Sequence, residues 1–399
     1  MRKKTLRDVN LKGRKVLMRV DFNVPLSKEG SITDDTRVRS SIPSIDYIAA
    51  QGASCVLMSH LGRPKGKKDK AYSLRPVADL LGDLVKHPVR FVGDCIGPDV
   101  EKSVSALRPG EILLLENVRF YSEEEANDPE FAKKLSKFGD IYSNDAFGTA
   151  HRAHASTVGV TQYFNDRVAG FLMEKEIEAL EGLLIDPARP FIAIMGGARV
   201  SGKLELIKNL LNRVDCILIG GGMAFTFFKA VGLEVGKSLV DDALVPLCRE
   251  VMDEAGRGEG KRIFLPVDCI VAKEISAASE SKLVSTGDIP EDWAGVDIGD
   301  KTVDLFREKL AGAKTVFWNG PMGVFEMPKF AGGTKKIAKI MAEITKKGTN
   351  TVIGGGDSVA ALNQLGLAAK ISHVSTGGGA SLELLEGKKL PGVEALSDK

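Results

Sequence analysis

Short apolar runs recur along the chain, and each is followed by a glycine-rich or polar turn and then by a segment with helical periodicity. In the first half the runs are KVLMRVDF (15–22), ASCVLMSH (53–60), VRFVGD (89–94), EILLLENV (111–118) and DIYSNDAF (140–147). In the second half they are PFIAIMGG (190–197), DCILIGGG (215–222), KTVFWNG (314–320), NTVIGGGD (350–357) and SHVSTGGG (372–379). Uninterrupted Val, Ile and Leu residues, rather than alternation with polar ones, predict parallel strands that helices cover on both faces.

The alternation of strands with helical segments predicts βαβ units, and therefore an α/β fold with two doubly wound parallel-sheet (Rossmann-like) domains. Between the two sets of runs lies EKEIEALEGLLIDPARP, whose apolar residues fall on one helical face until Pro187 ends the helix. We expect an N-terminal domain over residues 1–172, a connecting hinge helix over 173–187 and a C-terminal domain over 188–390.

Composition and charge narrow the possible functions. The length of 399 residues agrees with two domains, because it exceeds what one ordinary core accommodates. The net charge of +2 argues against a general nucleic-acid binder. No apolar run approaches the roughly 18 residues that span a membrane, and the basic N-terminus has no apolar segment behind it. We therefore expect a cytoplasmic protein with no nucleic-acid partner and no membrane partner.

The five cysteines are odd in number and show no C-x-x-C pairing. Several of them, such as Cys55 and Cys216, lie within apolar runs. This usage predicts reduced core residues in a cytosolic protein, with a catalytic thiol as the alternative.

Basic side chains follow the strands predicted in the first half, where the positive excess of the chain also lies. In open α/β sheets, ligands bind outside the carboxyl ends of the strands, so these side chains are candidates for a binding site. They are Arg19, Arg63, Arg119 and Arg152, with His60, His151 and His154, and Arg37 joins them from the predicted turn ITDDTRVRS. Guanidinium groups match carboxylate and phosphate oxygens, so the set predicts a site for a small, highly charged anion. A metal site at the histidines is disfavoured because an arginine between them would repel a cation.

Glycines follow the strands predicted in the second half. They lie at Gly196–Gly197, Gly220–Gly222, Gly354–Gly356 and Gly377–Gly379. Glycine lets backbone N–H groups approach a phosphate, and the N-terminus of the next helix adds a favourable dipole. One triplet could serve a turn or close packing alone, but three triplets after apolar runs predict phosphate binding. No triplet satisfies G-x-G-x-x-G with an acidic residue about 20 positions later, so a dehydrogenase is disfavoured.

The stretch IMGGARVSGKLELIKNLL fits part of the phosphate-loop pattern G-x-x-x-x-G-K-[ST], whose last residue holds Mg²⁺. Gly197, Gly202 and Lys203 fit the pattern, but Leu204 stands in the last position. A damaged loop, a chance pattern and a different mode of nucleotide binding are the alternatives, and the glycine turns favour the third. We expect Lys203 one turn into a helix and Leu204 in the core. Asp357 is then the candidate Mg²⁺ ligand, with helix N-capping as its alternative role.

Nine stretches together resemble one known family. They are RVDFNVP (19–25), SHLGRP (59–64), LLENVRF (114–120), NDAFGTAHRAHAS (144–156), GGARVSGKLELI (196–207), GGGMAFTF (220–227), WNGPMGVFE (318–326), GGGDSVAA (354–361) and STGGGASLELLEGKKLPGV (375–393). In this order, and essentially end to end, the chain is similar to the phosphoglycerate kinases.

The resemblance implies an N-terminal domain that binds 3-phosphoglycerate or 1,3-bisphosphoglycerate, and a C-terminal domain that binds Mg²⁺ with ADP or ATP as co-substrate. The implied substrate contacts are Asp21, Phe22, Asn23, Arg37, His60, Leu61, Gly62, Arg63, Arg119, His151, Arg152 and His154. The implied nucleotide contacts are Lys203, Gly220, Gly221, Gly222, Asn319, Pro321, Glu326, Gly355, Gly356, Asp357 and Ser358, with Asp357 as the Mg²⁺ ligand. Residues 391–399 are expected to return to the N-terminal domain. The absence of an apolar heptad pattern favours a monomer.

The implied catalytic groups are Arg37, Arg199 and the backbone N–H groups of Gly377, Gly378 and Gly379, which would stabilise the phosphoryl group in transit. The family usually has Lys at the position of Arg199, and we expect activity to survive because Arg keeps the charge. The acceptor of the implied reaction is a carboxylate that is already ionised, so no general base is required. This agrees with a predicted site that has no obvious Ser-His or Glu-His pair. We expect the two domains to close around the substrates.

Two other function classes remain as alternatives. A two-domain protein that binds a phosphorylated metabolite without chemistry would have the basic turns, but it does not predict the glycine turns together with Asp357. A nucleotide-regulated nucleic-acid binder needs a basic face with interleaved aromatic residues. Aromatic residues are only 6% of the chain, and RPKGKKDK (63–70) has none, so we expect that run to be a solvated loop.

Overall fold

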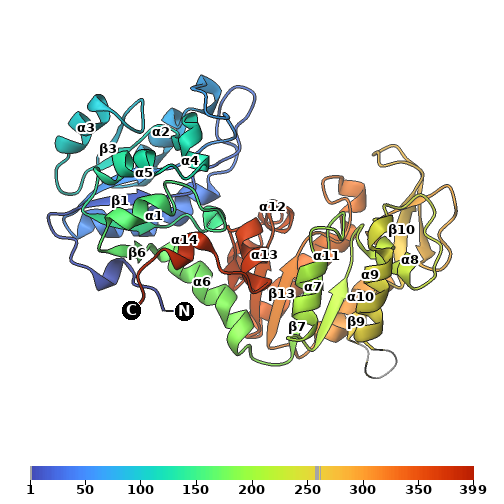
Figure 1. Ribbon diagram of the computed structural model, residues 1–399. Coiled ribbons are helices and arrows are strands. Elements are labelled where there is room, and N and C mark those ends of the chain that lie inside the picture. The colour runs from blue at the N-terminus through green and yellow to red at the C-terminus, as the bar shows by residue number, and fades with distance from the viewer. Residues whose placement is uncertain (1, 257–259, 261) are drawn as a thin grey trace. The chain divides into compact units, whose positions relative to one another are not determined.

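The computed structural model describes residues 2–256, 260 and 262–399, and the chain divides into two compact units. Unit 1 comprises Met1–Glu178 and Lys389–Lys399, and unit 2 comprises Ala179–Lys388. The division falls within helix α6 (Phe171–Ile185), which overlaps the helix predicted over 173–187 (Figure 1).

Unit 1 is built on a parallel sheet of six strands in the order β3-β4-β2-β1-β5-β6. The strands are β1 (Lys15–Arg19), β2 (Ser54–Met58), β3 (Val89–Phe91), β4 (Ile112–Leu114), β5 (Ile141–Asn144) and β6 (Arg167–Ala169). The helices are α1 (Thr36–Ala50), α2 (Arg75–Leu84), α3 (Pro98–Ser105), α4 (Ser122–Glu125), α5 (Pro129–Ser136) and α14 (Pro391–Glu394). Apolar residues at helical spacing bury one face of each longer helix, as Val77, Ala78 and Leu81 do in α2.

Unit 2 has its own parallel sheet of six strands in the order β15-β14-β13-β7-β8-β9. The strands are β7 (Phe191–Met195), β8 (Cys216–Ile219), β9 (Ile263–Phe264), β13 (Thr315–Asn319), β14 (Asn350–Gly354) and β15 (His373–Val374). The helices are α7 (Leu204–Leu211), α8 (Ala224–Ala230), α9 (Val245–Glu254), α10 (Asp300–Leu310), α11 (Gly332–Lys346), α12 (Gly356–Gln364) and α13 (Gly379–Leu385). A separate antiparallel sheet consists of β10 (Asp268–Ala272), β11 (Ser281–Ser285) and β12 (Ala294–Ile298).

Each six-stranded sheet has a switch point, where the chain continues from two neighbouring strands toward opposite edges of the sheet. In unit 1 this point lies between β1 and β5, and in unit 2 it lies between β7 and β13. Ligands of open α/β sheets bind outside the carboxyl ends of the strands at such points. The residues that follow these four strands are therefore the first candidates for a site.

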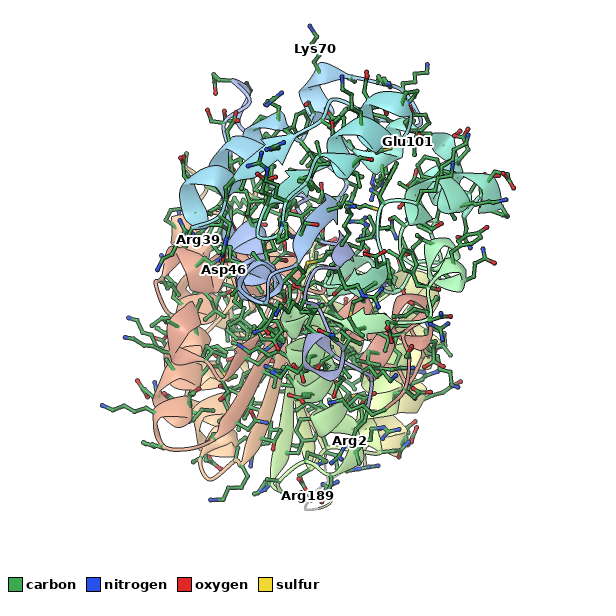
Figure 2. The ribbon with its side chains drawn as sticks, turned by 90° about the vertical axis from the view of Figure 1, so that its left-hand side faces the viewer. Arg2, Arg39, Asp46, Lys70, Glu101 and Arg189 are labelled. Carbon is green, nitrogen blue, oxygen red and sulfur yellow. The ribbon has the colours of Figure 1, made fainter. Side chains whose placement is uncertain are left out.

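Short 3₁₀ helices complete both units at η1 (Leu6–Asp8), η2 (Lys70–Tyr72), η3 (Val118–Phe120), η4 (Phe147–Thr149), η5 (Gly159–Tyr163), η6 (Asp242–Leu244), η8 (Pro328–Phe330) and η9 (Ala368–Lys370). Every apolar run of the sequence contains a strand, and the prediction of two parallel sheets is confirmed. The strands β6 and β9 and the antiparallel sheet were not predicted. All five cysteines are free and buried, which confirms them as core residues. The run 63–70 is confirmed as a largely exposed loop, from which Lys70 projects outward (Figure 2).

Both chain termini belong to unit 1 and lie side by side (Figure 1). Lys3 pairs with Asp398 in an isolated antiparallel bridge, and its ammonium group lies 2.7 Å from the Asp398 carboxylate. The N–H of Gly392 donates to the carbonyl of Ala150 at 2.8 Å. An added methyl group at Gly392 would lie only 2.9 Å from Cα of Ala150, so the returning segment packs closely against η4.

Candidate functional site

The loops that follow β1 and β2 in unit 1 are joined by hydrogen bonds. The N–H of Phe22 donates to Oγ of Ser59 at 2.9 Å, and the N–H of Gly62 donates to Oδ1 of Asn23 at 2.8 Å. These bonds bring together the predicted stretches 21–23 and 60–62. The side chains of Phe22 and Leu61 lie in the hydrophobic core, so they anchor the two loops rather than face a ligand.

Three of the predicted arginines are fixed by neighbours at this edge of the sheet. Arg37 lies in the first turn of α1 and not in a turn as predicted, and its Nη1 donates to Oδ2 of Asp21 at 2.7 Å. Nη1 of Arg119 donates to the carbonyl of Gly62 at 3.1 Å, and Nε of Arg152 donates to Nε2 of His151 at 3.2 Å. Arg63 is exposed in the loop after β2, whereas Arg19 is fully buried.

Two histidines of this cluster, His60 and His154, are neutral at neutral pH. Burial is the largest cause that lowers the pKa of His154 to about 4, and Arg119, Arg19, Arg152 and His151 act in the same direction. Burial also lowers the pKa of His60 well below its usual range, with Arg19, Arg119, Arg37 and His154 acting in the same direction. Since the same groups perturb both rings, the predicted residues form one electrostatic cluster. Its positive charge comes from the arginines.

In unit 2, three turns that follow strands are hydrogen-bonded into one surface. The N–H groups of Gly196 and Gly197 donate to the carbonyls of Asn319 and Pro321, both at 2.8 Å. The turn after β8 joins them, because the N–H of Met223 donates to the carbonyl of Gly197 at 3.0 Å. The predicted glycine turns at 196–197 and 220–222 therefore lie together at the switch point of the sheet with residues 319–321.

The glycines of these turns have different structural reasons. At Gly220, Gly221 and Gly222, an added Cβ would lie between 2.6 and 2.7 Å from side-chain or backbone atoms of neighbouring turns. Close packing against backbone atoms therefore requires glycine at 221 and 222, whereas a Cβ at 220 would displace the buried side chain of Met322. At Gly356 and Gly378, by contrast, an added Cβ would meet nothing within 4 Å. Packing therefore accounts for the triplet at 220–222, but it gives no reason for Gly356 or Gly378.

Lys203 lies beside the first glycine turn but not where the sequence predicted it. It occupies the N-cap position of α7, which begins at Leu204, because residues 201–203 form a turn instead of helix. Its ammonium group donates to the carbonyl of Gly196 at 2.6 Å. Burial lowers the pKa of Lys203 to about 8, and the carboxylate of Asp357 acts weakly in the opposite direction. The side chain of Leu204 is buried, as predicted.

The first turn of α12 provides the candidate metal ligand. Asp357 is exposed there, and it is not the N-cap as the alternative had it, because that position is held by Gly355. The neighbouring Ser358 accepts a hydrogen bond at 2.6 Å from the N–H of Gly320, which ties α12 to the turn after β13. One exposed carboxylate beside a phosphate-type turn suits Mg²⁺, which takes its other ligands from phosphate oxygens and water. Within the described ranges, no group of three His, Cys, Asp or Glu residues could hold a metal alone.

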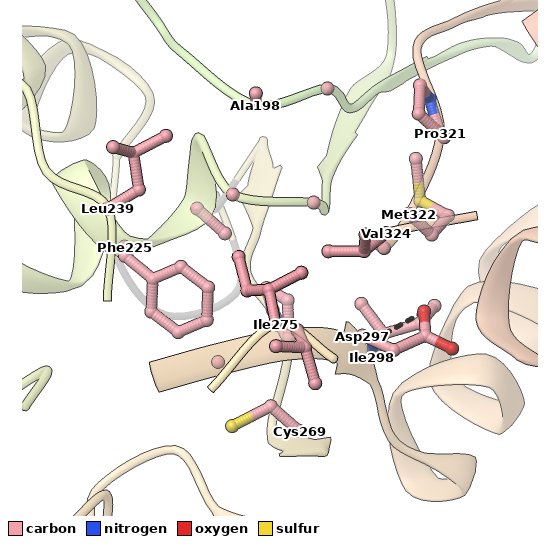
Figure 3. A pocket seen from close by; sticks show the side chains of 18 of the residues that line it. Ala198, Phe225, Leu239, Cys269, Ile275, Asp297, Ile298, Pro321, Met322 and Val324 are labelled. Atoms are coloured by element: carbon pink, nitrogen blue, oxygen red, sulfur yellow. Dashed lines mark hydrogen bonds between the residues drawn. The ribbon is translucent and has the colours of Figure 1, made fainter. Parts of the chain in front are cut away.

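A pocket of about 240 Å³ opens between these turns and the antiparallel sheet of unit 2 (Figure 3). Its lining includes the predicted residues Gly221, Gly222, Pro321, Glu326 and Asp357. Much of its wall is apolar and was not predicted, and consists of Ala198, Phe225, Leu239, Ile275, Val296 and Val324. Ala198, Phe225 and Val324 lie within stretches that the sequence analysis singled out, whereas Leu239, Ile275 and Val296 had no local signal. The pocket can receive the flat apolar end of a ligand whose charged end points to the glycine turns.

The remaining predicted catalytic groups lie in two other loops of unit 2. Arg199 is 60% exposed, and its Nη1 lies 2.9 Å from Oδ1 of Asp241. The N–H groups of Val200 and Ser201 donate to the other oxygen of this carboxylate at 3.1 and 3.2 Å. At the start of α13, the N–H of Gly377 donates to Oγ of Ser375 at 3.1 Å.

No helix within residues 2–256, 260 and 262–399 is both long enough and apolar enough to cross a membrane. The chain matches a family model described as Phosphoglycerate kinase over residues 6–388. It is 54% identical over 398 residues to a protein named Phosphoglycerate kinase from Chlorobium limicola, with 100% of both chains covered. It is 55% identical to a cytosolic phosphoglycerate kinase of Triticum aestivum, over 99% of this chain and 98% of that protein. A solved structure of phosphoglycerate kinase from Coxiella burnetii shares 38% identity and a TM-score of 0.86, over 98% of each chain.

Proposed function

Because the chain belongs to the phosphoglycerate kinase family and is therefore a kinase of glycolysis, we propose that its two units divide the substrates of that reaction. Unit 1 binds 3-phosphoglycerate or 1,3-bisphosphoglycerate, and unit 2 binds ADP or ATP with Mg²⁺. The observation that carries this proposal is the contrast between the two sites. Unit 1 offers a cluster of arginines with the neutral histidines His60 and His154, whereas unit 2 offers glycine turns and a carboxylate beside an apolar pocket.

In unit 1, the guanidinium groups of Arg37, Arg119 and Arg152 would neutralise the phosphate and the carboxylate of the substrate, since Arg binds such groups through two N–H donors. Asp21 holds Arg37 in place through their hydrogen bond. Asn23 and the 60–62 stretch would position the rest of the molecule. Arg63, exposed in the loop after β2, would complete the positive rim.

In unit 2, the purine would occupy the apolar pocket and the phosphates would run along the glycine turns toward α12. Lys203 would then lie within reach of the phosphates through the turn that it contacts. Asp357, in the first turn of α12, would hold Mg²⁺, which neutralises charge on the phosphate oxygens when it is bound. Glu326, which lines the same pocket, would contact the nucleoside.

The chemical step requires alignment and charge neutralisation rather than a general base, because the attacking carboxylate of 3-phosphoglycerate is already ionised. Arg199 and the backbone N–H groups of 377–379 would stabilise the phosphoryl group as its charge spreads over three oxygens. The family usually has Lys where this chain has Arg199, and a guanidinium retains the positive charge of the ammonium group. In-line transfer needs reacting atoms about 3–3.5 Å apart.

The two sites belong to different units, so we propose that binding of both substrates draws the units together by bending at α6. Small-angle scattering tests this, because the radius of gyration should fall only when both ligands are present. We further propose that the protein is cytoplasmic, which the five free, buried cysteines support. We also propose that it is a monomer. Light scattering on the purified chain checks the oligomeric state.

The site assignment is tested with a coupled assay of ATP plus 3-phosphoglycerate. Arg37→Ala should lower kcat/KM by at least about 10²-fold, since single arginines contribute roughly 10³–10⁵ in other phosphoryl transfers. Arg39→Ala is the matched control, because Arg39 lies on the same helix but is exposed and pairs only locally with Asp35 (Figure 2). Full activity of Arg37→Ala would show that the substrate site is elsewhere.

A further inference from the structure

Arg19 differs from the other arginines of unit 1 because its side chain is fully buried. It lies at the last position of β1, and its guanidinium is surrounded by protein groups. Nε donates to Oγ of Ser156 at 2.8 Å, and Nη1 donates to the carbonyl of Val20. Nη2 lies 3.1 Å from Nδ1 of His60. A ligand cannot displace these partners without unpacking the core, so Arg19 acts on the site through its neighbours.

The contact between Arg19 and His60 fixes the proton of the imidazole. A guanidinium has only donors and stays charged, so Nδ1 of His60 must be the acceptor of this hydrogen bond. The proton of a neutral ring then sits on Nε2. The other groups that face His60 agree with a neutral ring, because Arg119, Arg37 and His154 oppose its charging. The Asp21 carboxylate, 4.0 Å from Nδ1, is already hydrogen-bonded to Arg37.

A buried carboxylate holds Arg19 in this position through one hydroxyl group. Glu124 is fully buried, and its carboxylate accepts two hydrogen bonds from Ser156, one from Oγ at 2.6 Å and one from the backbone N–H at 2.8 Å. Since Ser156 Oγ already accepts from Arg19, its single hydrogen must point to Glu124. The donors in the chain Arg19–Ser156–Glu124 therefore all point in one direction. This leaves Nη2 of Arg19 free to donate to the ring.

We propose that Arg19, held by Ser156 and Glu124, is a positioning residue that fixes His60 as the neutral Nε2–H tautomer, so that His60 presents one uncharged N–H donor to the substrate. The second half of this statement rests on the proposed role of His60 in binding 3-phosphoglycerate. The arginines then carry the charge of the site, while His60 donates one directional hydrogen bond to an acceptor oxygen of the substrate. Because the ring does not titrate near pH 6.5, this donor is present on both sides of that pH.

The tautomer is measured directly by two-bond ¹H–¹⁵N correlation spectra of the full-length chain labelled at its five histidines. The ring of His60 is assigned from the spectrum of His60→Gln. We expect a neutral Nε2–H pattern at every pH from about 5.5 to 8. A proton on Nδ1, or an imidazolium signal that titrates near pH 6.5, would overturn the inference.

Variants of the network test the cause. Arg19→Met should release His60, so that a second tautomer or a titration near pH 6.5 appears. Ser156→Ala should do the same in part, whereas Ser156→Thr keeps the hydroxyl and should preserve the native pattern. If Arg19→Met does not fold, as checked by circular dichroism, the Ser156 pair still decides the question. An unchanged His60 spectrum in Ser156→Ala would show that the network does not set the tautomer.

Kinetics test the link to the substrate separately. The amide nitrogen of His60→Gln can replace the Nε2–H donor, whereas that of His60→Asn sits near the Nδ1 position. We expect KM for 3-phosphoglycerate within about threefold of wild type in the Gln variant and raised at least about tenfold in the Asn variant, with KM for ATP unchanged in both. If the spectra confirm the tautomer but neither KM changes, the substrate role of His60 fails while the network stands. The reverse loss, a raised KM in Gln and not in Asn, would contradict the Nε2–H donor.

Discussion

Packing of the protein requires glycine at Gly221, in the turn after β8, whereas a Cβ added at Gly356, at the start of α12, meets nothing within 4 Å. Substitution of each by Ala separates the two cases. Gly221 has φ +66°, and an added Cβ would lie 2.7 Å from the backbone N and O of Gly197 and from the carbonyl of Pro321. An L-residue in the left-handed region costs about 1–2 kcal/mol, and overpacking typically costs about 1–3 kcal/mol. The lower chain entropy of unfolded Ala returns about 0.4–1 kcal/mol. Gly221→Ala should therefore destabilise unit 2 by about 2–4 kcal/mol.

The assay uses a property of the sequence, since both tryptophans, Trp293 and Trp318, lie in unit 2 and are buried. Urea unfolding followed by tryptophan fluorescence therefore reports on unit 2. Gly202→Ala is the matched control, because an added Cβ at this exposed turn position meets nothing within 4 Å. It should change the unfolding free energy by no more than about 0.5 kcal/mol. If Gly221→Ala unfolds within 0.5 kcal/mol of wild type as well, the packing argument is refuted.

Gly356→Ala should behave in the opposite way. Gly356 begins α12, and an added Cβ meets nothing within 4 Å, so the protein gains helix propensity of up to about 1 kcal/mol. If phosphates approach this turn closely, the same methyl group should raise the dissociation constant for ADP at least about fivefold by calorimetry. Unchanged ADP affinity with normal stability would remove Gly356 from the nucleotide site.

Three further predictions concern charge. Asp145 is fully buried with its pKa raised to about 7 by burial, so between about pH 4 and 7 the folded state holds a proton that the unfolded state has lost. Stability should fall as pH rises through this window, and Asp145→Asn should remove up to roughly 4 kcal/mol of that fall in urea titrations followed by circular dichroism. Lys203, with its pKa lowered to about 8, should lose its charge between pH 7 and 9. The affinity for ADP, measured by calorimetry, should therefore weaken over this range in the wild type but not in Lys203→Arg. An equal pH dependence of ADP affinity in the two proteins would contradict this. Arg199→Lys should keep kcat within about tenfold of wild type, while Arg199→Met should lower kcat at least about 10²-fold, because the positive charge is needed and the planar guanidinium is not. A Met variant as active as the Lys variant would exclude Arg199 as a catalytic group.

The sequence was sufficient for the parallel sheets because each of their main strands is a continuous apolar run that ends in a turn. It was not sufficient for β9, which has two residues, or for β11 (Ser281–Ser285), whose apolar Leu283 is largely exposed. The arginine cluster could be predicted because parallel strands place their carboxyl ends at one edge. That Arg19 lies beneath the cluster could not, because burial at a strand end depends on what packs over it.

The apolar half of the pocket in unit 2 shows the same limit. Leu239 and Ile275 look like ordinary surface residues in the sequence, and both remain substantially exposed in the structure. They line a pocket only because the loop after α8, which contains Leu239, and the segment between β10 and β11, which contains Ile275, lie opposite the glycine turns. The misplacement of Lys203 has a local cause, since a turn at 201–203 delays the start of α7 by one helical turn.

The pairing of Lys3 with Asp398 makes unit 1 the outer part of the chain and unit 2 an insertion within it. A ribosome that synthesises this protein releases the whole of unit 2 before it releases the eleven residues, Lys389–Lys399, that complete unit 1. The half that is translated first is therefore the half that is finished last. Joining Arg2 and Lys399, which lie side by side, and opening the chain in an exposed loop of unit 2 would make unit 1 the continuous unit and unit 2 the divided one.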